Sequence, residues 1–242
     1  MMHTLYLLGD STCAIKRKEA FPETGWGEAF AEYLADGWVL DNRALNGRST
    51  KSFIDEGLFA AVLSSVKDGD GAIIQFGHND SKPDPERYSA PYQGYVDNLV
   101  FMAEELKNRG VCVYFASSIA RRQFDNCGIL RETHGEYIHA MHYAAFRASV
   151  PCLDLTTPTM LEVQALGDEE SKKYYMNFPS GEYDNYPNGK EDNTHLRPEG
   201  ARWVSHLVAR ELSTILPRPE FLSSDISSDW ILEDVTKLEV VD

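Results

Sequence analysis

The sequence predicts an α/β fold in which a five-stranded parallel sheet lies between two layers of helices. Short apolar runs recur at even intervals along the chain, and segments with helical periodicity lie between them. Continuous apolar runs are typical of parallel strands that helices cover on both faces, because neither face meets water. The alternation therefore indicates a three-layer α/β/α arrangement.

The individual elements follow from these patterns. The five apolar runs, each expected to be a strand, are residues 5–8, 38–40, 72–76, 111–116 and 150–155. Apolar residues at helical spacing predict one helix over residues 96–106, ending near Gly110, and another over residues 137–148. Pro198 is expected in the first turn of a last helix that continues to Leu212.

Length and composition favour one domain with a sizeable core. The chain has 242 residues, of which 43% are hydrophobic. We expect a catalytic domain over residues 1–216 and a C-terminal extension of unknown role over residues 217–242, which contains Trp230-Ile231-Leu232. No internal repeat or low-complexity tract interrupts this pattern.

Charge and hydropathy restrict the partners and the location. The net charge of −15 would repel nucleic acid and anionic membranes, so we expect neither as a partner. No stretch approaches the roughly 20 apolar residues of a membrane span. The only early apolar run has four residues, too few for a secretory leader, which predicts a cytoplasmic protein. The oligomeric state stays open.

Neither a cofactor nor a metal is expected. The four cysteines show no CxxC spacing, and the chain has neither a GxGxxG motif nor a P-loop. Glu136 and His139 have the spacing of one half of a di-iron site, but such a site needs the motif twice.

The predicted topology indicates where a site must lie. Ligands of open α/β sheets bind outside the carboxyl ends of the strands. Three polar loops are expected there: Gly9-Asp10-Ser11, Asn46-Gly47-Arg48 and Gly77-His78-Asn79-Asp80. The polar segment 174–193 is expected to fold over this edge and bring Asp192 and His195 to Ser11.

These residue types can form a serine nucleophile system. A serine hydroxyl needs an imidazole to take its proton, and the imidazole needs a carboxylate to fix its tautomer. We therefore expect Ser11 as nucleophile, His195 as general base and Asp192 as its orienting partner. The alternative, non-catalytic interpretations are a helix N-cap at Ser11 and a solvated turn at Asp192 and His195.

Further polar residues are candidates for transition-state and substrate contacts. The N–H groups of Ser11 and Gly47 and the side-chain amide of Asn79 are the expected oxyanion hole. Candidate substrate contacts are Asp10, Arg48, His78, Arg121 and Arg122. Arg48, Lys51, Arg121 and Arg122 suggest an electropositive rim for an acidic sugar, against the alternative of a solvated surface. The aromatic residues Tyr174, Tyr175, Phe178, Tyr183 and Tyr186 suggest either a sugar-stacking surface or packing beneath the loop.

Several strings, in order, resemble the blocks of one enzyme family. They are Gly9-Asp10-Ser11-Thr12, Thr24-Gly25-Trp26-Gly27, Asn42-Arg43-Ala44 with Gly47-Arg48-Ser49, Gln75-Phe76-Gly77-His78-Asn79-Asp80, Thr133-His134-Gly135 and Asp192-Asn193-Thr194-His195. The chain resembles the SGNH, or GDSL-type, hydrolases. Within them it resembles the rhamnogalacturonan acetylesterase branch, which has a threonine after Gly-Asp-Ser, as Thr12 is here. Asn46 replaces a glycine that is frequent there, and residues after Pro217 have no counterpart.

This resemblance implies a flavodoxin-like SGNH hydrolase fold and a carbohydrate acetylesterase. It implies Ser11, Asp192 and His195 as catalytic residues, with an oxyanion hole of Ser11, Gly47 and Asn79. The implied substrate is an acetylated oligosaccharide, with pectic rhamnogalacturonan as its source. A metal-dependent phosphoesterase and a non-catalytic sugar-binding module remain as alternatives.

Overall fold

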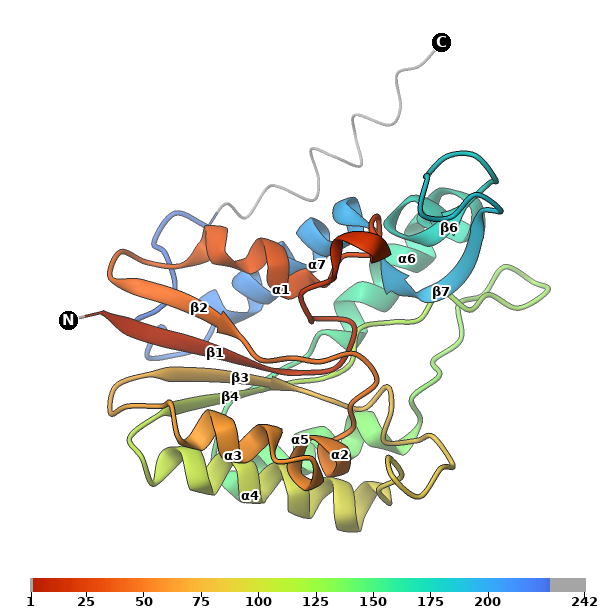
Figure 1. Cartoon of the computed structure of the whole chain (residues 1–242). Coiled ribbons are helices and arrows are strands. Elements are labelled where there is room, and N and C mark those ends of the chain that lie inside the picture. Colours follow the sequence, from red (N-terminus) through yellow and green to blue (C-terminus); the bar gives the residue numbers. More distant parts are fainter. Residues whose placement is uncertain (1, 227–242) are drawn as a thin grey trace.

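A parallel sheet forms the centre of the molecule (Figure 1). In the computed structural model, which describes residues 2–226, its strands are β1 (His3–Gly9), β2 (Trp38–Asn42), β3 (Gly71–Gln75), β4 (Cys112–Ala116) and β5 (Cys152–Leu153). The order is β2-β1-β3-β4-β5, and every neighbouring pair is parallel. The predicted fold class is confirmed, although β5 is shorter than its apolar run.

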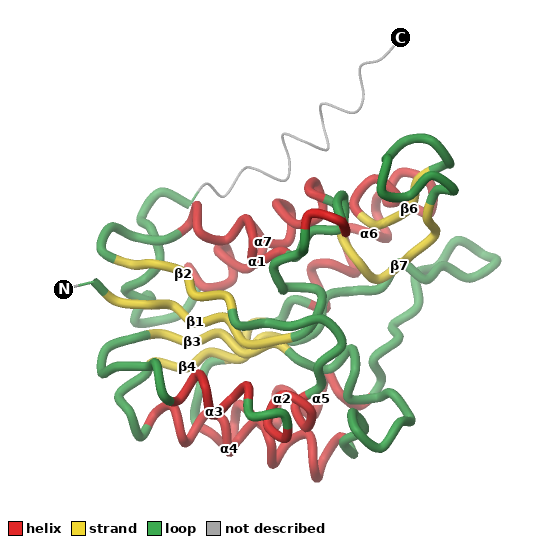
Figure 2. The backbone as a smooth tube through the Cα atoms, in the orientation of Figure 1, coloured by secondary structure: helices red, strands yellow, loops and turns green. Residues whose placement is uncertain are grey.

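Helices cover both faces of this sheet (Figure 2). One layer contains α2 (Thr50–Asp55), α3 (Leu58–Leu63), α4 (Val96–Lys107) and α5 (Glu136–Ala148); the other contains α1 (Trp26–Ala29), α6 (Thr156–Glu170) and α7 (Pro198–Ser213). Short helical turns span Lys18–Ala20, Phe30–Tyr33, Pro91–Tyr95 and Ser171–Tyr174. The three helices predicted from apolar periodicity correspond to α4, α5 and α7. No helix within residues 2–226 is long and apolar enough to cross a membrane.

Each central strand contributes to two apolar layers. Along β1, Leu5 and Leu7 pack into the layer that includes Trp203 of α7, whereas Leu8 packs into the layer that includes Leu99 of α4. Successive side chains of a strand point to opposite faces, so one apolar run fills both layers. The buried sheet therefore provides a rigid base for the loops at its carboxyl edge.

Two strands lie outside this sheet. β6 (Tyr175–Phe178) and β7 (Lys190–Leu196) form an antiparallel pair. Figure 2 shows this pair on the side of the molecule toward which the carboxyl ends of β1 and β3 point. The polar segment expected to fold over the edge of the sheet is thus a two-stranded hairpin.

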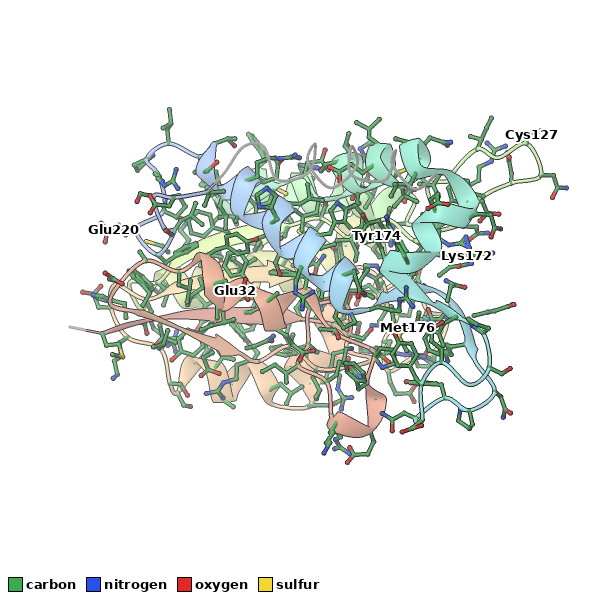
Figure 3. All side chains as sticks on the ribbon, turned by 90° about the horizontal axis from the view of Figure 1, so that it is seen from above. Glu32, Cys127, Lys172, Tyr174, Met176 and Glu220 are labelled. Carbon is green, nitrogen blue, oxygen red and sulfur yellow. The ribbon has the colours of Figure 1, made fainter. Side chains whose placement is uncertain are left out.

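The chain just after residue 216 packs against the sheet. The Phe221 ring lies 5.7 Å from that of Trp38 and 5.4 Å from that of Tyr114, centroid to centroid, and Leu222 pairs with Leu34. Phe221 and Leu222 belong to the buried core, so residues beyond 216 pack with the catalytic domain, and a boundary at residue 216 stays a prediction. Figure 3 shows Glu220 at one end of the molecule, well away from Met176 of β6. Trp230-Ile231-Leu232 lies outside the described residues.

Candidate active site

Ser11, His195 and Asp192 form a continuous hydrogen-bonded series. Ser11 lies just beyond the carboxyl end of β1, and its Oγ is 2.9 Å from Nε2 of His195. Nδ1 of the same imidazole is 2.8 Å from Oδ2 of Asp192. All three residues line a cavity of about 450 Å³. The structure thus brings the two ends of the chain together at one site.

A bulge in β7 makes the contact between Asp192 and His195 possible. Residues three apart in a regular strand point to opposite faces. Here Leu196 pairs with Tyr175 while Asp192 pairs with the next residue, Met176, so the intervening residues leave the regular pairing. Oδ1 of Asp192 accepts the backbone N–H groups of Thr194 at 2.9 Å and His195 at 3.1 Å, which holds the bulge. Asp192 and His195 therefore lie on an irregular strand, whereas the alternative interpretation was a solvated turn.

The electrostatics of this pair favour an ionised carboxylate. Partial burial acts to raise the pKa of Asp192, but the hydrogen bond and charge of His195 and the two backbone N–H groups lower it below its usual range. An ionised Asp192 accepts a proton-bearing Nδ1, which leaves Nε2 of His195 free to accept from the Ser11 hydroxyl. The arrangement can remove a proton from Ser11.

Asp10 stabilises the turn that carries Ser11. Its Oδ1 accepts the Thr12 N–H at 2.9 Å and the Thr12 hydroxyl at 2.8 Å, and its Oδ2 lies 3.3 Å from Nδ1 of His78. Burial acts to raise the pKa of Asp10, but His78 and Thr12 lower it to about 2. Asp10 is 0% exposed and its carboxylate holds the loop, while its contact with substrate stays a prediction.

His78 joins this buried group to the wall of the cavity. It is 3% exposed and lines the cavity beside Ser11. Its ring meets that of His134 edge-on at 4.7 Å, and Nδ1 of His134 lies 3.0 Å from Oε1 of Glu132. Burial lowers the pKa of His134 to about 4, so this imidazole is neutral at pH 7.

The expected oxyanion-hole residues Ser11, Gly47 and Asn79 lie on the three loops that follow β1, β2 and β3. Asn79 lines the cavity, and its Nδ2 donates to the backbone carbonyl of Arg48 at 3.0 Å. Gly47 has φ +77°, a left-handed conformation that favours glycine. It lies outside the wall of the cavity, so its N–H as an oxyanion donor stays a prediction.

Lys16 is a site residue that the motifs did not reveal. Its ammonium donates to the backbone carbonyl of Ser11 and to Oδ1 of Asn46 at 2.7 Å. It also forms an ion pair with Glu23 at 2.8 Å, and its side chain is 3% exposed. Lys16 therefore connects the Ser11 turn to the loop of Gly47, and Asn46 provides a side-chain acceptor where a glycine has none.

The predicted arginines separate into three environments. Arg121 lines the cavity, whereas Arg48 pairs with Glu56 outside it, Nε to Oε2 at 3.0 Å. Arg122 is buried, pairs with Asp168 and lines a second cavity of about 560 Å³. The backbone turns at Arg122, where the N–H of Gln123 donates to the carbonyl of Arg121 at 3.0 Å, and the two arginine side chains line different cavities. One shared electropositive rim is therefore wrong, while Ser81, Lys82 and Thr194 line the cavity unpredicted.

The aromatic residues of segment 174–186 pack with one another and with the core. Tyr175 is buried and donates to the carbonyl of Ala120 at 2.9 Å. The Phe178 ring meets those of Tyr183 and Tyr186 at centroid distances of 4.7 and 5.6 Å. Tyr174 packs on Trp203. Of the two interpretations, packing beneath the loop describes these residues.

Within residues 2–226, no group of three or more His, Cys, Asp or Glu side chains is arranged to hold a metal ion. Cys13, two residues after Ser11, is fully buried, and burial raises its pKa well above the usual range. Ser11 is therefore the candidate nucleophile at this edge of the sheet.

Comparisons with known proteins identify the family of this chain. The model of the GDSL-like lipase/acylhydrolase family matches residues 7–203. Rhamnogalacturonan acetylesterase RhgT of Bacillus subtilis (strain 168) is 38% identical over 221 residues, which cover 91% of this chain and 94% of that protein. The rhamnogalacturonan acetylesterase of Emericella nidulans is 26% identical, with 91% and 92% covered.

Solved structures share the fold. Protein YxiM of Bacillus subtilis superposes with a TM-score of 0.74 at 22% identity, over 88% of this chain and 56% of that one. The acetyl xylan esterase AlAXEase gives a TM-score of 0.58 at 14% identity, over 88% and 100% of the two chains. Because the family model matches residues 7–203, most of this chain, the chain belongs to the GDSL-like lipase/acylhydrolase family.

Proposed function

We propose that this protein is a serine esterase that removes acetyl groups from carbohydrate, with acetylated rhamnogalacturonan oligosaccharides as its substrates. The observation that carries the proposal is the hydrogen-bonded series from Ser11 through His195 to Asp192 at the cavity wall. The relatives named rhamnogalacturonan acetylesterase, at 38% and 26% identity over most of the chain, support the choice of substrate.

The first half of the reaction transfers the acetyl group to the enzyme. Nε2 of His195 accepts the Ser11 proton while Oγ attacks the acetyl carbonyl, and the carbonyl electrons move onto its oxygen. The N–H groups of Ser11 and Gly47 and the Asn79 amide stabilise this oxyanion. When the tetrahedral intermediate collapses, the bond to the sugar oxygen breaks, and that oxygen takes the proton from His195.

The second half regenerates the enzyme. Water enters the place of the sugar, and His195 takes one of its protons as the oxygen attacks the acetyl carbon. Collapse then breaks the bond to Ser11, which recovers its proton from His195 and releases acetic acid. Asp192 stays ionised throughout and stabilises the imidazolium that forms in each half.

Replacing the nucleophile tests this proposal. We expect Ser11→Ala to abolish hydrolysis of p-nitrophenyl acetate and acetate release from acetylated rhamnogalacturonan, with an unchanged circular dichroism spectrum. A fluorophosphonate should label Ser11 in the unaltered protein, as read by mass spectrometry. Ser64→Ala, at the end of α3, is the matched control. Undiminished turnover in Ser11→Ala would contradict the proposal, and activity on acetylated xylan alone would contradict its substrate.

A further inference from the structure

A second cavity lies on the other side of β7 from the catalytic residues. Asp192 and Thr194 line the smaller cavity described above. Glu191 and Asn193 line a larger one of about 560 Å³. The two pairs alternate along β7, so this strand forms a wall of both cavities. The other walls are the end of α6, strand β6 and the loop after β4, which meet on one side of the molecule (Figure 1). The volume falls in the range of small-molecule sites.

Arg122 places a buried hydrogen-bond donor at this cavity. The residue is 5% exposed, and its Nη1 donates to Asp168. Its guanidinium carbon lies 6.0 Å from the centre of the Phe124 ring. Nε of Arg122 is buried, and no residue within the described part of the chain accepts a hydrogen bond from it. A buried donor without a partner is costly, which favours a ligand that brings an acceptor.

Three amide side chains add free donors and acceptors to the wall. Nδ2 of Asn177 donates to the backbone carbonyl of Asp192 at 2.9 Å and to Oδ1 of Asn193 at 3.0 Å. Among residues 2–226, nothing engages the remaining acceptor of Asn177, the Nδ2 donor of Asn193 or the side chain of Gln123. Hydroxyl groups both donate and accept, so a hydroxylated ligand suits this wall.

The charges around the second cavity balance. Its lining contains charged residues of both signs: Arg122, Lys172, Lys190, Asp168 and Glu191. Arg122 pairs with Asp168. Lys172 pairs at 2.8 Å with Glu169, which lies just outside the lining. The remaining two, Lys190 and Glu191, are neighbours of opposite charge on β7. A charged ligand would lose its hydration here without meeting an unmatched charge, which favours a neutral one.

Apolar surface completes the wall. Phe124, Phe178 and Pro179 line the same cavity as the amides. A pyranose ring presents apolar C–H groups on its faces and hydroxyls around its rim, and pockets that combine aromatic rings with a few polar groups suit such ligands. We propose that the second cavity is a non-catalytic binding site for a neutral sugar unit. The inference goes beyond the proposed function, because neither Ser11 nor His195 lines this cavity.

Binding can be measured with the catalytic cavity blocked. A bulky fluorophosphonate is first attached to Ser11, and the methyl glycosides of galactose, rhamnose and xylose are then titrated while ¹H–¹⁵N spectra are recorded. We expect a Kd on the order of 1 mM for at least one glycoside, as is usual for a ligand of this size. The amide signals of Gln123, Asn177 and Asn193 should shift. The methyl glycoside of galacturonic acid, which differs from the galactoside in its carboxylate, should bind more weakly than the galactoside.

Two variants test the lining. Gln123→Trp should abolish binding, because the indole would occupy the cavity. The side chain of Gln123 is exposed and has no contact that the fold needs, so hydrolysis of p-nitrophenyl acetate should be unchanged. Asn126→Trp, on the same loop but outside the lining, is the matched control and should bind normally. Arg122→Lys should raise Kd about ten-fold, the effect of one lost hydrogen bond to a charged group. If Arg122→Lys fails to fold, Gln123→Trp still decides.

The outcomes separate this inference from the proposed function. An absence of shifts at Gln123, Asn177 and Asn193 with all three glycosides at about 50 mM, well above the expected Kd, would overturn the inference. Binding that survives in Gln123→Trp, or tighter binding of the galacturonic acid glycoside, would overturn it as well. Failure of the fluorophosphonate to label Ser11 would count against the proposed function alone, because the same amide shifts report the second cavity in the unlabelled protein.

Discussion

Oγ of Ser11 and Nε2 of His195 lie 2.9 Å apart, although 184 positions separate the two residues in the chain. The contact depends on two independent supports. Asp10 stabilises the Ser11 turn by accepting the backbone N–H and the hydroxyl of Thr12. In the bulge of β7, Asp192 accepts the backbone N–H of His195 and so positions its imidazole. Each support can be altered separately, so their contributions to catalysis are measurable.

Asp192→Asn should lower kcat for p-nitrophenyl acetate by about 10³- to 10⁴-fold. An amide has no negative charge to stabilise the imidazolium, and its N–H₂ would favour the wrong tautomer of His195. The asparagine oxygen can still accept the N–H groups of Thr194 and His195, so the bulge and the fold should persist. Asp184→Asn, on the exposed loop between β6 and β7, is the control; equal rates in both variants would exclude the role of Asp192.

Lys16→Met should reduce kcat by roughly ten- to a hundred-fold, the order of loss that follows from a small misplacement of reacting groups. The change removes the contacts with the Ser11 carbonyl and with Asn46. KM should stay nearly constant, because Lys16 does not line the cavity. Steady-state kinetics check this, with the exposed Lys18→Met as control. A folded Lys16→Met protein with normal kcat would show that the two loops hold their positions without it.

The sequence was sufficient to predict the sheet, the long helices and the edge that carries the site. Apolar runs mark every strand of the main sheet, and α4, α5 and α7 carry clear apolar stripes. By contrast, α6 buries only Thr156, Thr159 and Val163, so it has no apolar stripe to detect. The polar strand β7, with the sequence KEDNTHL, likewise lacks the alternation by which strands are predicted.

The separate placements of Arg121 and Arg122 and the contacts of Lys16 were beyond sequence reasoning. Proximity in the chain grouped Arg121 with Arg122, yet the backbone sends the two side chains into different cavities. The role of Lys16 depends on the path of the loop that brings Asn46 beside the Ser11 turn. Such contacts depend on loop conformations that no local pattern specifies.

Asp80→Asn should change how stability depends on pH. Asp80 is fully buried, and burial, with a smaller effect of Asp10, raises its pKa to about 7 despite hydrogen bonds from Thr50. Between about pH 4 and 7 the folded state therefore holds a proton that the unfolded state has lost, so the free energy of unfolding falls as pH rises through this window. An asparagine cannot ionise, while its oxygen can still accept from Thr50.

Urea unfolding at pH 4.5, 6 and 8 measures this difference. Asp80→Asn should gain stability over the unaltered protein as pH rises, by on the order of 3 kcal/mol across the window. The contribution of Glu132 is common to both proteins and cancels in the comparison. Asp84→Asn, whose carboxylate is half-exposed and paired with Arg87, should show little of this trend. Parallel pH profiles for Asp80→Asn and the unaltered protein would be inconsistent with a protonated Asp80.

Phe221→Ala should destabilise the protein by about 3–5 kcal/mol, the usual cost of removing a buried aromatic ring. Phe221 is 1% exposed, and its ring lies between those of Trp38 on β2 and Tyr114 on β4, the strands on either side of β1 and β3. The neighbouring residue Glu220 lies well away from Met176 of β6 (Figure 3), so kcat of the folded fraction should be unchanged. Urea unfolding and kinetics below the transition measure the two effects. Leu216→Ala, at a side chain that is 89% exposed, should stay within about 0.5 kcal/mol. If Phe221→Ala cost less than about 1 kcal/mol, residues 217–222 would lie outside the cooperative unit, and a domain ending at residue 216 would be the better description.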